Sequence, residues 1–202
     1  MRAFIITDIQ NDFVAGGSLE VPGGEQVIPL VNQLSEHFDL VVATQDWHPP
    51  THMSFASNHS GKNIFDTIKL GGLEQVLWPD HCVQGSKGEA FRDDLHMNRV
   101  EAIFRKGMDP EIDSYSAFYD NGYKKNTGLA GFLKDRAVTH VYLCGLAGDY
   151  CVFYSAKDAL KAEFETIIIE DATRAISKDR FEKAKKEIRR LGGEIIQSDN
   201  IL

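Results

Sequence analysis

HVYLCGLAGDYCVFYSAKDALKA, residues 140–162, contains a strand, a turn and a helix in immediate succession. Residues 140–144 form a mostly apolar run of strand length, small residues follow, and apolar side chains recur at helical spacing over 150–162. A strand without regular polar alternation is typical of one that is covered on both faces, as in a parallel sheet. This stretch therefore predicts one unit of an α/β fold.

Similar units recur along the chain. Further apolar runs of strand length lie at 3–6, 40–43, 100–104, 166–169 and 194–196, and further helical patterns lie at 25–38, 128–136 and 178–191. Strands and helices that alternate predict parallel strands joined by right-handed crossovers. We therefore expect an α/β fold, a three-layer α/β/α sandwich with a mainly parallel sheet of about six strands in a Rossmann-like topology. Sites in such folds lie at the carboxyl ends of the strands.

The chain length and one irregular segment predict the domain organisation. A chain of 202 residues with 43% hydrophobic content can bury one substantial core, so we expect a single domain over 1–202. The segment 46–94 interrupts the alternation and is rich in His, Pro, Gly and Asn. Because it is too long for a plain connection, we interpret it as a metal-binding insertion.

Charge and cysteine content exclude several classes of partner. A formal net charge of -8 argues against nucleic acid, whose phosphates require a basic face. No signal-peptide core or membrane-length apolar span is present, so we expect no membrane association and a cytoplasmic location. Three cysteines are too few for a secreted disulfide framework, which favours reduced thiols. Whether the chain forms a homo-oligomer stays open.

Cys151 is the candidate nucleophile. It follows a buried strand and a turn of small residues, in the first turn of the helix predicted at 150–162. Free amides and the positive end of the helix dipole would stabilise a thiolate there and could bind an oxyanion. The alternative is a buried structural cysteine, an interpretation that suits Cys144, inside its strand, much better.

Two charged residues follow other strands. Asp8 comes directly after the first strand, and Lys106 follows the strand at 100–104. Taken alone, Asp8 is more readily explained as a loop cap, and Lys106 as a solvated lysine. Together with Cys151 at one edge of the sheet, they offer the groups needed for acyl transfer. Asp8 would take the thiol proton, and Lys106 would hold both anions by charge.

A set of metal ligands lies in the 46–94 segment. Asp46 and His48 follow the second strand, and a third ligand, His81, would complete an open Asp-His-His site. His52 and His59 are either additional ligands or ordinary loop histidines. The alternative for the whole set is a group of unrelated polar loop residues, since the spacing matches no closed zinc signature.

Five ordered motifs, taken together, resemble a known family. They are DIQNDF at 8–13, DWHPPTHMSF at 46–55, WPDHCVQG at 78–85, RKG at 105–107 and GLAGDYCV at 145–152. The chain resembles the isochorismatase-like cysteine hydrolases, and the second and third motifs are similar to those of the nicotinamidase branch, to which the metal site belongs.

The resemblance implies a catalytic triad and a metal site. The triad would be Asp8, Lys106 and Cys151. One divalent ion would be bound by three residues, with zinc expected first and iron or manganese as alternatives, and no organic cofactor is implied. The expected ligands are Asp46, His48 and His81, with His52 as a fourth ligand or behind the ligands.

The resemblance also implies substrate contacts. The backbone amides of Ala147 and Cys151 would form the oxyanion hole, beside a cis peptide bond between Leu146 and Ala147. Phe13, Trp78 and Tyr115 would enclose a pyridine ring. One position departs from the family, which usually has Thr where this chain has Gly148. We expect only a small change in the rigidity of that turn.

The implied activity is hydrolysis of nicotinamide to nicotinate and ammonia through a cysteine thioester, in NAD salvage, with action on pyrazinamide as well. One alternative is a related hydrolase that acts on another small amide or a ureido compound. A remote alternative, from a different class, is a catalytically idle binding domain.

Overall fold

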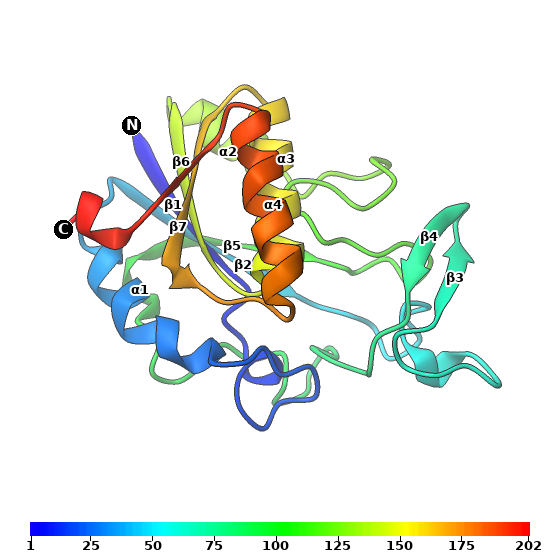
Figure 1. Ribbon diagram of the computed structural model, residues 1–202. Coiled ribbons are helices and arrows are strands. Elements are labelled where there is room, and N and C mark those ends of the chain that lie inside the picture. The colour runs from blue at the N-terminus through cyan, green and yellow to red at the C-terminus, as the bar shows by residue number, and fades with distance from the viewer.

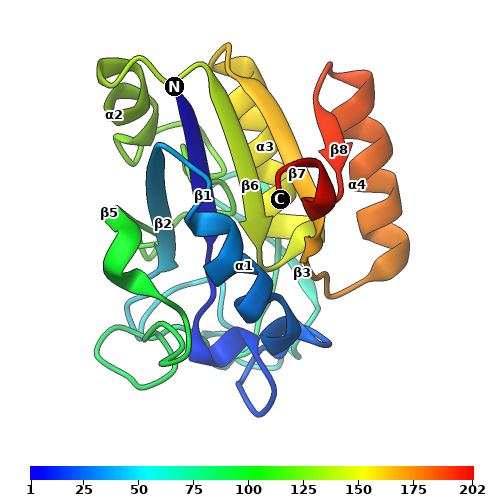
Figure 2. The same cartoon turned by 90° about the vertical axis from the view of Figure 1, so that its left-hand side faces the viewer.

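Six parallel strands form the central sheet. In the computed structural model, which describes residues 1–202, the strand order is β5-β2-β1-β6-β7-β8 and every neighbouring pair is parallel (Figure 2). The strands are β1 (Arg2–Thr7), β2 (Leu40–Asp46), β5 (Val100–Lys106), β6 (His140–Gly145), β7 (Glu165–Thr173) and β8 (Glu194–Ile196). All six predicted strands are present, and most extend a few residues beyond the predicted runs.

Helices cover both faces of this sheet. The helix α1 (Ile28–Ser35) lies on one face, and the other three helices lie on the opposite face (Figure 1). Side chains of β1 alternate between the two cores, because Phe4 packs with α1 whereas Ile5 packs with the opposite layer. The helices of that layer are α2 (Leu129–Asp135), α3 (Phe153–Lys161) and α4 (Lys178–Arg190). The predicted three-layer α/β/α sandwich is confirmed.

Two predicted helices are shorter in the structure. The pattern at 25–38 contains a 3-10 turn, Gly24–Val27, before α1 begins. The pattern at 150–162 becomes α-helical only at Phe153, because a π-helical turn, Gly148–Val152, comes first. Single π-helical turns are frequent at functional sites.

The edge strand β5 differs from the sequence-based expectation of strands covered on both faces. From Val100 to Arg105 its side chains alternate between half-buried and exposed, and 49% of Ile103 is exposed, whereas Lys106 at its end is buried. The cause is its position at the end of the strand order, next to β2 alone. The register of this pair still places Asp46 opposite Lys106.

The segment 46–94 contributes no strand to the main sheet but forms a separate hairpin. The hairpin consists of β3 (Thr67–Leu70) and β4 (Leu73–Val76), which pair antiparallel and lie to one side of the sandwich (Figure 1). Gly71 and Gly72 connect them with φ values of 57° and 85°. A two-residue Gly-Gly turn with positive φ at both positions is a typical hairpin connection, so this hairpin had a sequence signal that our prediction missed.

The strand order places a crevice at the carboxyl end of β1. From β1 the chain proceeds to β2 and β5 on one side, and β6, β7 and β8 lie on the other side. Ligands of open α/β sheets bind where the order reverses in this way.

None of the helices combines the length and apolar character that a membrane crossing requires.

Candidate active site

Four strand ends bring the candidate catalytic groups together. Asp8 follows β1, Asp46 ends β2, Lys106 ends β5, and Cys151 lies in the π-helical turn beyond β6. Because all four strands are parallel, these ends meet at one edge of the sheet. All four side chains are buried, with at most 6% of any residue exposed.

Lys106 lies at the centre of this group. Its Nζ atom is 2.8 Å from Asp8 Oδ2, 2.5 Å from Asp46 Oδ1 and 3.4 Å from Cys151 Sγ, and it also donates to the carbonyl oxygen of Ser114 at 3.2 Å. The two carboxylates raise the pKa of Lys106 well above its ordinary value although burial alone would lower it. The ammonium therefore stays charged and links both carboxylates to the thiol.

Asp8 is held through both of its carboxylate oxygens. The hydroxyl of Thr44 donates to Oδ1 at 2.6 Å, and Oδ2 forms an ion pair with the Lys106 ammonium at 2.8 Å. Burial raises the pKa of Asp8, Lys106 opposes the rise, and Asp46 adds to it. The backbone of Asp8 has a φ of 47°, a left-handed conformation that is uncommon for a residue with a Cβ and is found preferentially at functional sites. The carboxyl group is thus suited to accept and return a proton.

The thiol of Cys151 is buried beside Lys106, and burial favours its protonated form, from which Asp8 was expected to take the proton. Burial raises the pKa of the thiol well above its ordinary value, and the ammonium of Lys106 lowers it only in part. An adjacent base is therefore required to activate the thiol. Nearby, the amide nitrogen of Ala147 makes no hydrogen bond, which leaves it free to bind an oxyanion. The expected cis peptide bond between Leu146 and Ala147 is present.

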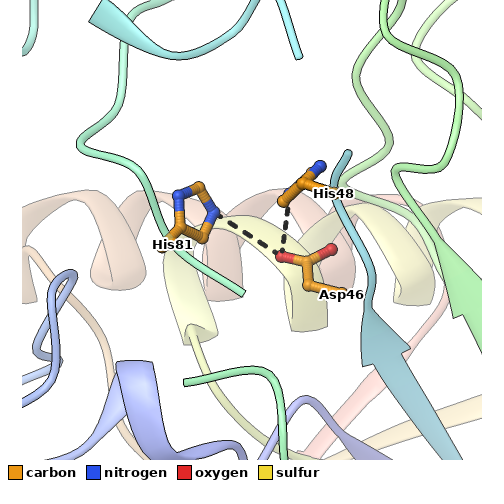
Figure 3. A group of neighbouring side chains, drawn as sticks. All are labelled: Asp46, His48 and His81. Carbon is orange, nitrogen blue, oxygen red and sulfur yellow. Dashed lines mark ion pairs between the residues drawn. The ribbon is translucent and has the colours of Figure 1, made fainter. Parts of the chain in front are cut away.

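Asp46, His48 and His81 converge as a potential metal site. The Nε2 atoms of His48 and His81 lie 3.6 and 3.8 Å from Asp46 Oδ2 (Figure 3). Each imidazole uses its other nitrogen, Nδ1, in a contact with a backbone carbonyl, that of Gly107 at 2.9 Å for His48 and that of Pro79 at 2.8 Å for His81. Carbonyl partners of this kind hold a metal-binding histidine with Nε2 directed at the ion.

The charges of Asp46 and His81 fit a divalent cation, whereas the carboxylate of Asp46 raises the pKa of His48 although burial alone would lower it, so that an ion would have to displace a proton there. Burial would raise the pKa of Asp46, but Lys106 and His48 outweigh it, so that the group is ionised. Burial and the neighbouring His48 lower the pKa of His81 to about 4, which makes it neutral, as a ligand must be. The buried donor set of one carboxylate and two imidazoles suits zinc, iron or manganese.

The other two histidines of the segment have different surroundings. His52 accepts a hydrogen bond at Nδ1 from the amide of Ser54 at 3.1 Å, so the neutral ring carries its proton on Nε2. That Nε2 atom is buried without a partner, in a group with His48 and Asp113. His59 makes a contact of 2.8 Å with the carbonyl of Met53 and belongs to no close group of potential ligands.

A pocket opens over the thiol and the potential metal site. The three aromatic residues predicted as substrate contacts, Phe13, Trp78 and Tyr115, all line it, together with Ala147 and Cys151. Trp78 and Tyr115 meet edge to face, at 88° between their ring planes. The pocket thus combines aromatic walls with the polar groups described above.

The pocket also contains residues that sequence reasoning missed: Leu19, Asp113, Tyr150 and Ile176. Two of them had a usable signal, because Tyr150 directly precedes the candidate nucleophile and Ile176 follows the carboxyl end of β7. Leu19 and Asp113 lie in loops without a pattern that indicates a site.

Comparison with known proteins identifies the family. The isochorismatase domain model matches residues 2–200. A nicotinamidase of Acinetobacter baylyi is 47% identical over 201 residues, which cover 99% of this chain and 94% of the relative. The order of five motifs along the chain had predicted this relationship.

Solved structures agree with the sequence match. A nicotinamidase and pyrazinamidase of Acinetobacter baumanii superimposes with a TM-score of 0.97 at 44% identity, covering 100% of this chain and 98% of the other. PnC1 of L. infantum, in complex with nicotinate, superimposes with a TM-score of 0.88 at 38% identity, covering 100% of this chain and 95% of the other. A pyrazinamidase of Pyrococcus horikoshii, in complex with zinc, superimposes with a TM-score of 0.80 at 37% identity, covering 97% of this chain and 98% of the other. The chain therefore belongs to the isochorismatase family, and its relatives there include nicotinamidases and pyrazinamidases.

Proposed function

We propose that this protein is a nicotinamidase, which hydrolyses nicotinamide to nicotinate and ammonia and also acts on pyrazinamide. The observation that carries the proposal is the contact of Lys106 with both Asp8 and Cys151, beside the Asp46-His48-His81 group and under one aromatic pocket. A thiol with an adjacent proton acceptor is the arrangement needed to form and hydrolyse a thioester. The nicotinamidase relatives support the same substrate.

The first half of the reaction forms the thioester. Asp8 removes the proton of Cys151, and the thiolate attacks the amide carbon. The amides of Ala147 and Cys151 stabilise the oxyanion, while Lys106 holds the two anionic partners together. Asp8 then returns the proton to the leaving nitrogen, the carbon–nitrogen bond breaks and ammonia departs.

The second half consumes one water molecule. Asp8, again ionised, takes a proton from the water as its oxygen attacks the thioester carbonyl. The carbon–sulfur bond breaks, Cys151 recovers its proton from Asp8, and the acid leaves as nicotinate after it releases its remaining proton to solvent. Phe13, Trp78 and Tyr115 keep the pyridine ring in place through both halves.

Asp46, His48 and His81 would hold one divalent ion, with zinc expected first and no organic cofactor. The bound ion would supply a Lewis acid that anchors the pyridine nitrogen. We assign His52 to a place behind the ligands rather than to the ion itself, because its Nδ1 accepts from Ser54 and its protonated Nε2 is a donor.

The test is ammonia release from nicotinamide, pyrazinamide, benzamide and a ureido compound by metal-analysed protein. Turnover of the two amides with a ring nitrogen, and not of benzamide, is the expected result. Equal activity on benzamide, or activity on the ureido compound alone, would keep the cysteine hydrolase and overturn the substrate. Metal content near one ion per chain that persists in both His48→Ala and His81→Ala would overturn the ligand assignment.

The cellular setting stays a prediction. A small-molecule amide is the expected partner, and we place the reaction in NAD salvage in the cytoplasm, with no nucleic-acid or membrane partner. One domain over 1–202 with a metal-binding insertion at 46–94 is the organisation that this proposal assumes.

A further inference from the structure

The β3–β4 hairpin has a single buried side chain. Only Gln75 is buried, with 3% exposed, and all other residues of the two strands are half-buried or exposed. A glutamine in a small hairpin ordinarily faces water. A buried amide requires hydrogen-bond partners, and those of Gln75 lie outside the hairpin as well as within it.

The partners of Gln75 belong to the wall of the pocket. Its Nε2 atom donates to Asp113 Oδ2 at 2.9 Å, to the hydroxyl oxygen of Tyr115 at 3.0 Å and to the carbonyl of Val76 at 2.8 Å. The Nε1 atom of Trp78 donates to the same Tyr115 oxygen at 3.2 Å. Asp113, Tyr115 and Trp78 all line the pocket, whereas Gln75 does not. Gln75 therefore contacts the pocket walls from behind.

The orientation of Asp113 depends on this contact. The amide of Ser114 donates to Oδ1 at 2.7 Å and Gln75 donates to Oδ2, so that both oxygens are held. In this orientation a carboxylate oxygen of Asp113 lies within 4.8 Å of ring nitrogens of His48 and His52. The bond from Gln75 is the only one of the two that comes from a distant segment, 38 residues away in the chain.

The chemistry of the donor matters at this position. A neutral amide can donate to a buried carboxylate without adding charge. A carboxylate in place of Gln75 would repel Asp113. An aliphatic side chain would leave Asp113 Oδ2 without the donor that holds it and the Tyr115 hydroxyl with Trp78 Nε1 as its remaining donor.

We propose that Gln75 is a positioning residue, which holds Asp113 and Tyr115 in place and so sets the affinity of the pocket for the pyridine amide. The inference rests on the proposed function. It assigns to the hairpin the task of fixing one wall of the site, through a residue that touches neither the substrate nor the reacting atoms.

The experiment compares Gln75→Glu and Gln75→Leu with Glu74→Gln, a control on the exposed, neighbouring position of the same strand. For each protein kcat and KM for nicotinamide, the affinity for nicotinate by calorimetry, the bound metal and the melting temperature are measured. Loss of a hydrogen bond to a charged group should raise KM and weaken nicotinate binding about tenfold or more in both Gln75 variants. The control should match the wild type, and kcat should stay within about twofold in all proteins.

Three results would overturn the inference. Unchanged KM and nicotinate affinity in both variants would do so, even with a lowered melting temperature, because Gln75 would then serve stability alone. Loss of kcat at constant KM would place the effect in the chemical step. Failure of both variants to fold would likewise assign Gln75 to stability. A wild type that releases no ammonia from nicotinamide would instead overturn the proposed function, and the inference with it.

Discussion

Replacement of Gly107 by alanine should displace a proposed metal ligand without touching the reacting atoms. A Cβ atom at this position would lie 2.3 Å from Cε1 and 2.6 Å from Nδ1 of His48. An ordinary contact is about 3.5 Å, so the imidazole must move by roughly 1 Å. That movement also disrupts the contact of His48 Nδ1 with the carbonyl of Gly107.

The size of the effect follows from two separate terms. The φ of Gly107 is 69°, and a left-handed conformation costs alanine about 1–2 kcal/mol. In a protein of this size that cost lowers the melting temperature by about 2–8 °C. Loss of the orienting contact of a ligand typically weakens metal binding about 10- to 100-fold. We expect the metal affinity of Gly107→Ala to fall by that factor.

The control for backbone strain is Gly61→Ala. Gly61 has a φ of 72° but nothing within 4 Å of its Cβ position. Competition with a chelator gives the metal affinity of both variants, and thermal unfolding without metal gives their stability. Both should lose stability, and only Gly107→Ala should lose metal affinity. An equal metal affinity in the two variants would refute the role of His48 as a ligand held by Gly107.

Three further predictions concern charge, packing and the metal. Lys106→Met should lower the free energy of unfolding by about 3–5 kcal/mol, because it leaves the buried carboxylates of Asp8 and Asp46 without their cation. Urea unfolding measures this loss, and a loss below about 1 kcal/mol would contradict the prediction. Gly148→Thr should cost about 1–3 kcal/mol, since its Cβ would lie 2.9 Å from both the ring of Phe181 and the methyl group of Thr173. Phe181→Leu should relieve the part of that cost that comes from the ring; an equal cost in both backgrounds would disprove the contribution of Phe181. Removal of the metal by a chelator should lower the melting temperature by roughly 5–10 °C relative to protein with the ion at about 100 times its Kd, and His81→Asn should abolish the difference.

The strand ends were the most predictable part of the site. Asp8, Asp46 and Lys106 follow apolar runs that are visible in the sequence, and parallel strands bring such ends to one edge. Their convergence within hydrogen-bond distance therefore follows from local pattern and topology together. Cys151 was found by the same reasoning, although the π-helical turn around it was not.

The protonation of the site was harder to predict. The position of Cys151 near a helix start suggested a thiolate, but burial depends on how much of the rest of the chain covers it. The charged neighbours of an ionisable group are easier to predict from sequence than the degree to which the group is exposed to water. Asp8 was already expected to take the thiol proton, and the burial of Cys151 is the reason why such a base is needed.

Contacts between distant loops escaped the sequence altogether. Gln75 and Asp113 form a hydrogen bond although they lie 38 residues apart, and each is of a residue type that is ordinarily found at the surface. Gly148 is a comparable case. From the sequence we expected only a small change in the rigidity of its turn, whereas in the structure the ring of Phe181 occupies space that a side chain at position 148 would need. Such pairs depend on packing that no local pattern records.

The most direct test of the account compares wild type with Cys151→Ala at saturating nicotinamide, with nicotinamide binding to both proteins measured by calorimetry. We predict that wild type releases ammonia and nicotinate in equal amounts, and that the variant binds nicotinamide but releases neither above the uncatalysed rate. Ammonia release by the variant would contradict the thioester mechanism, and no release by the metal-loaded wild type would contradict the function itself.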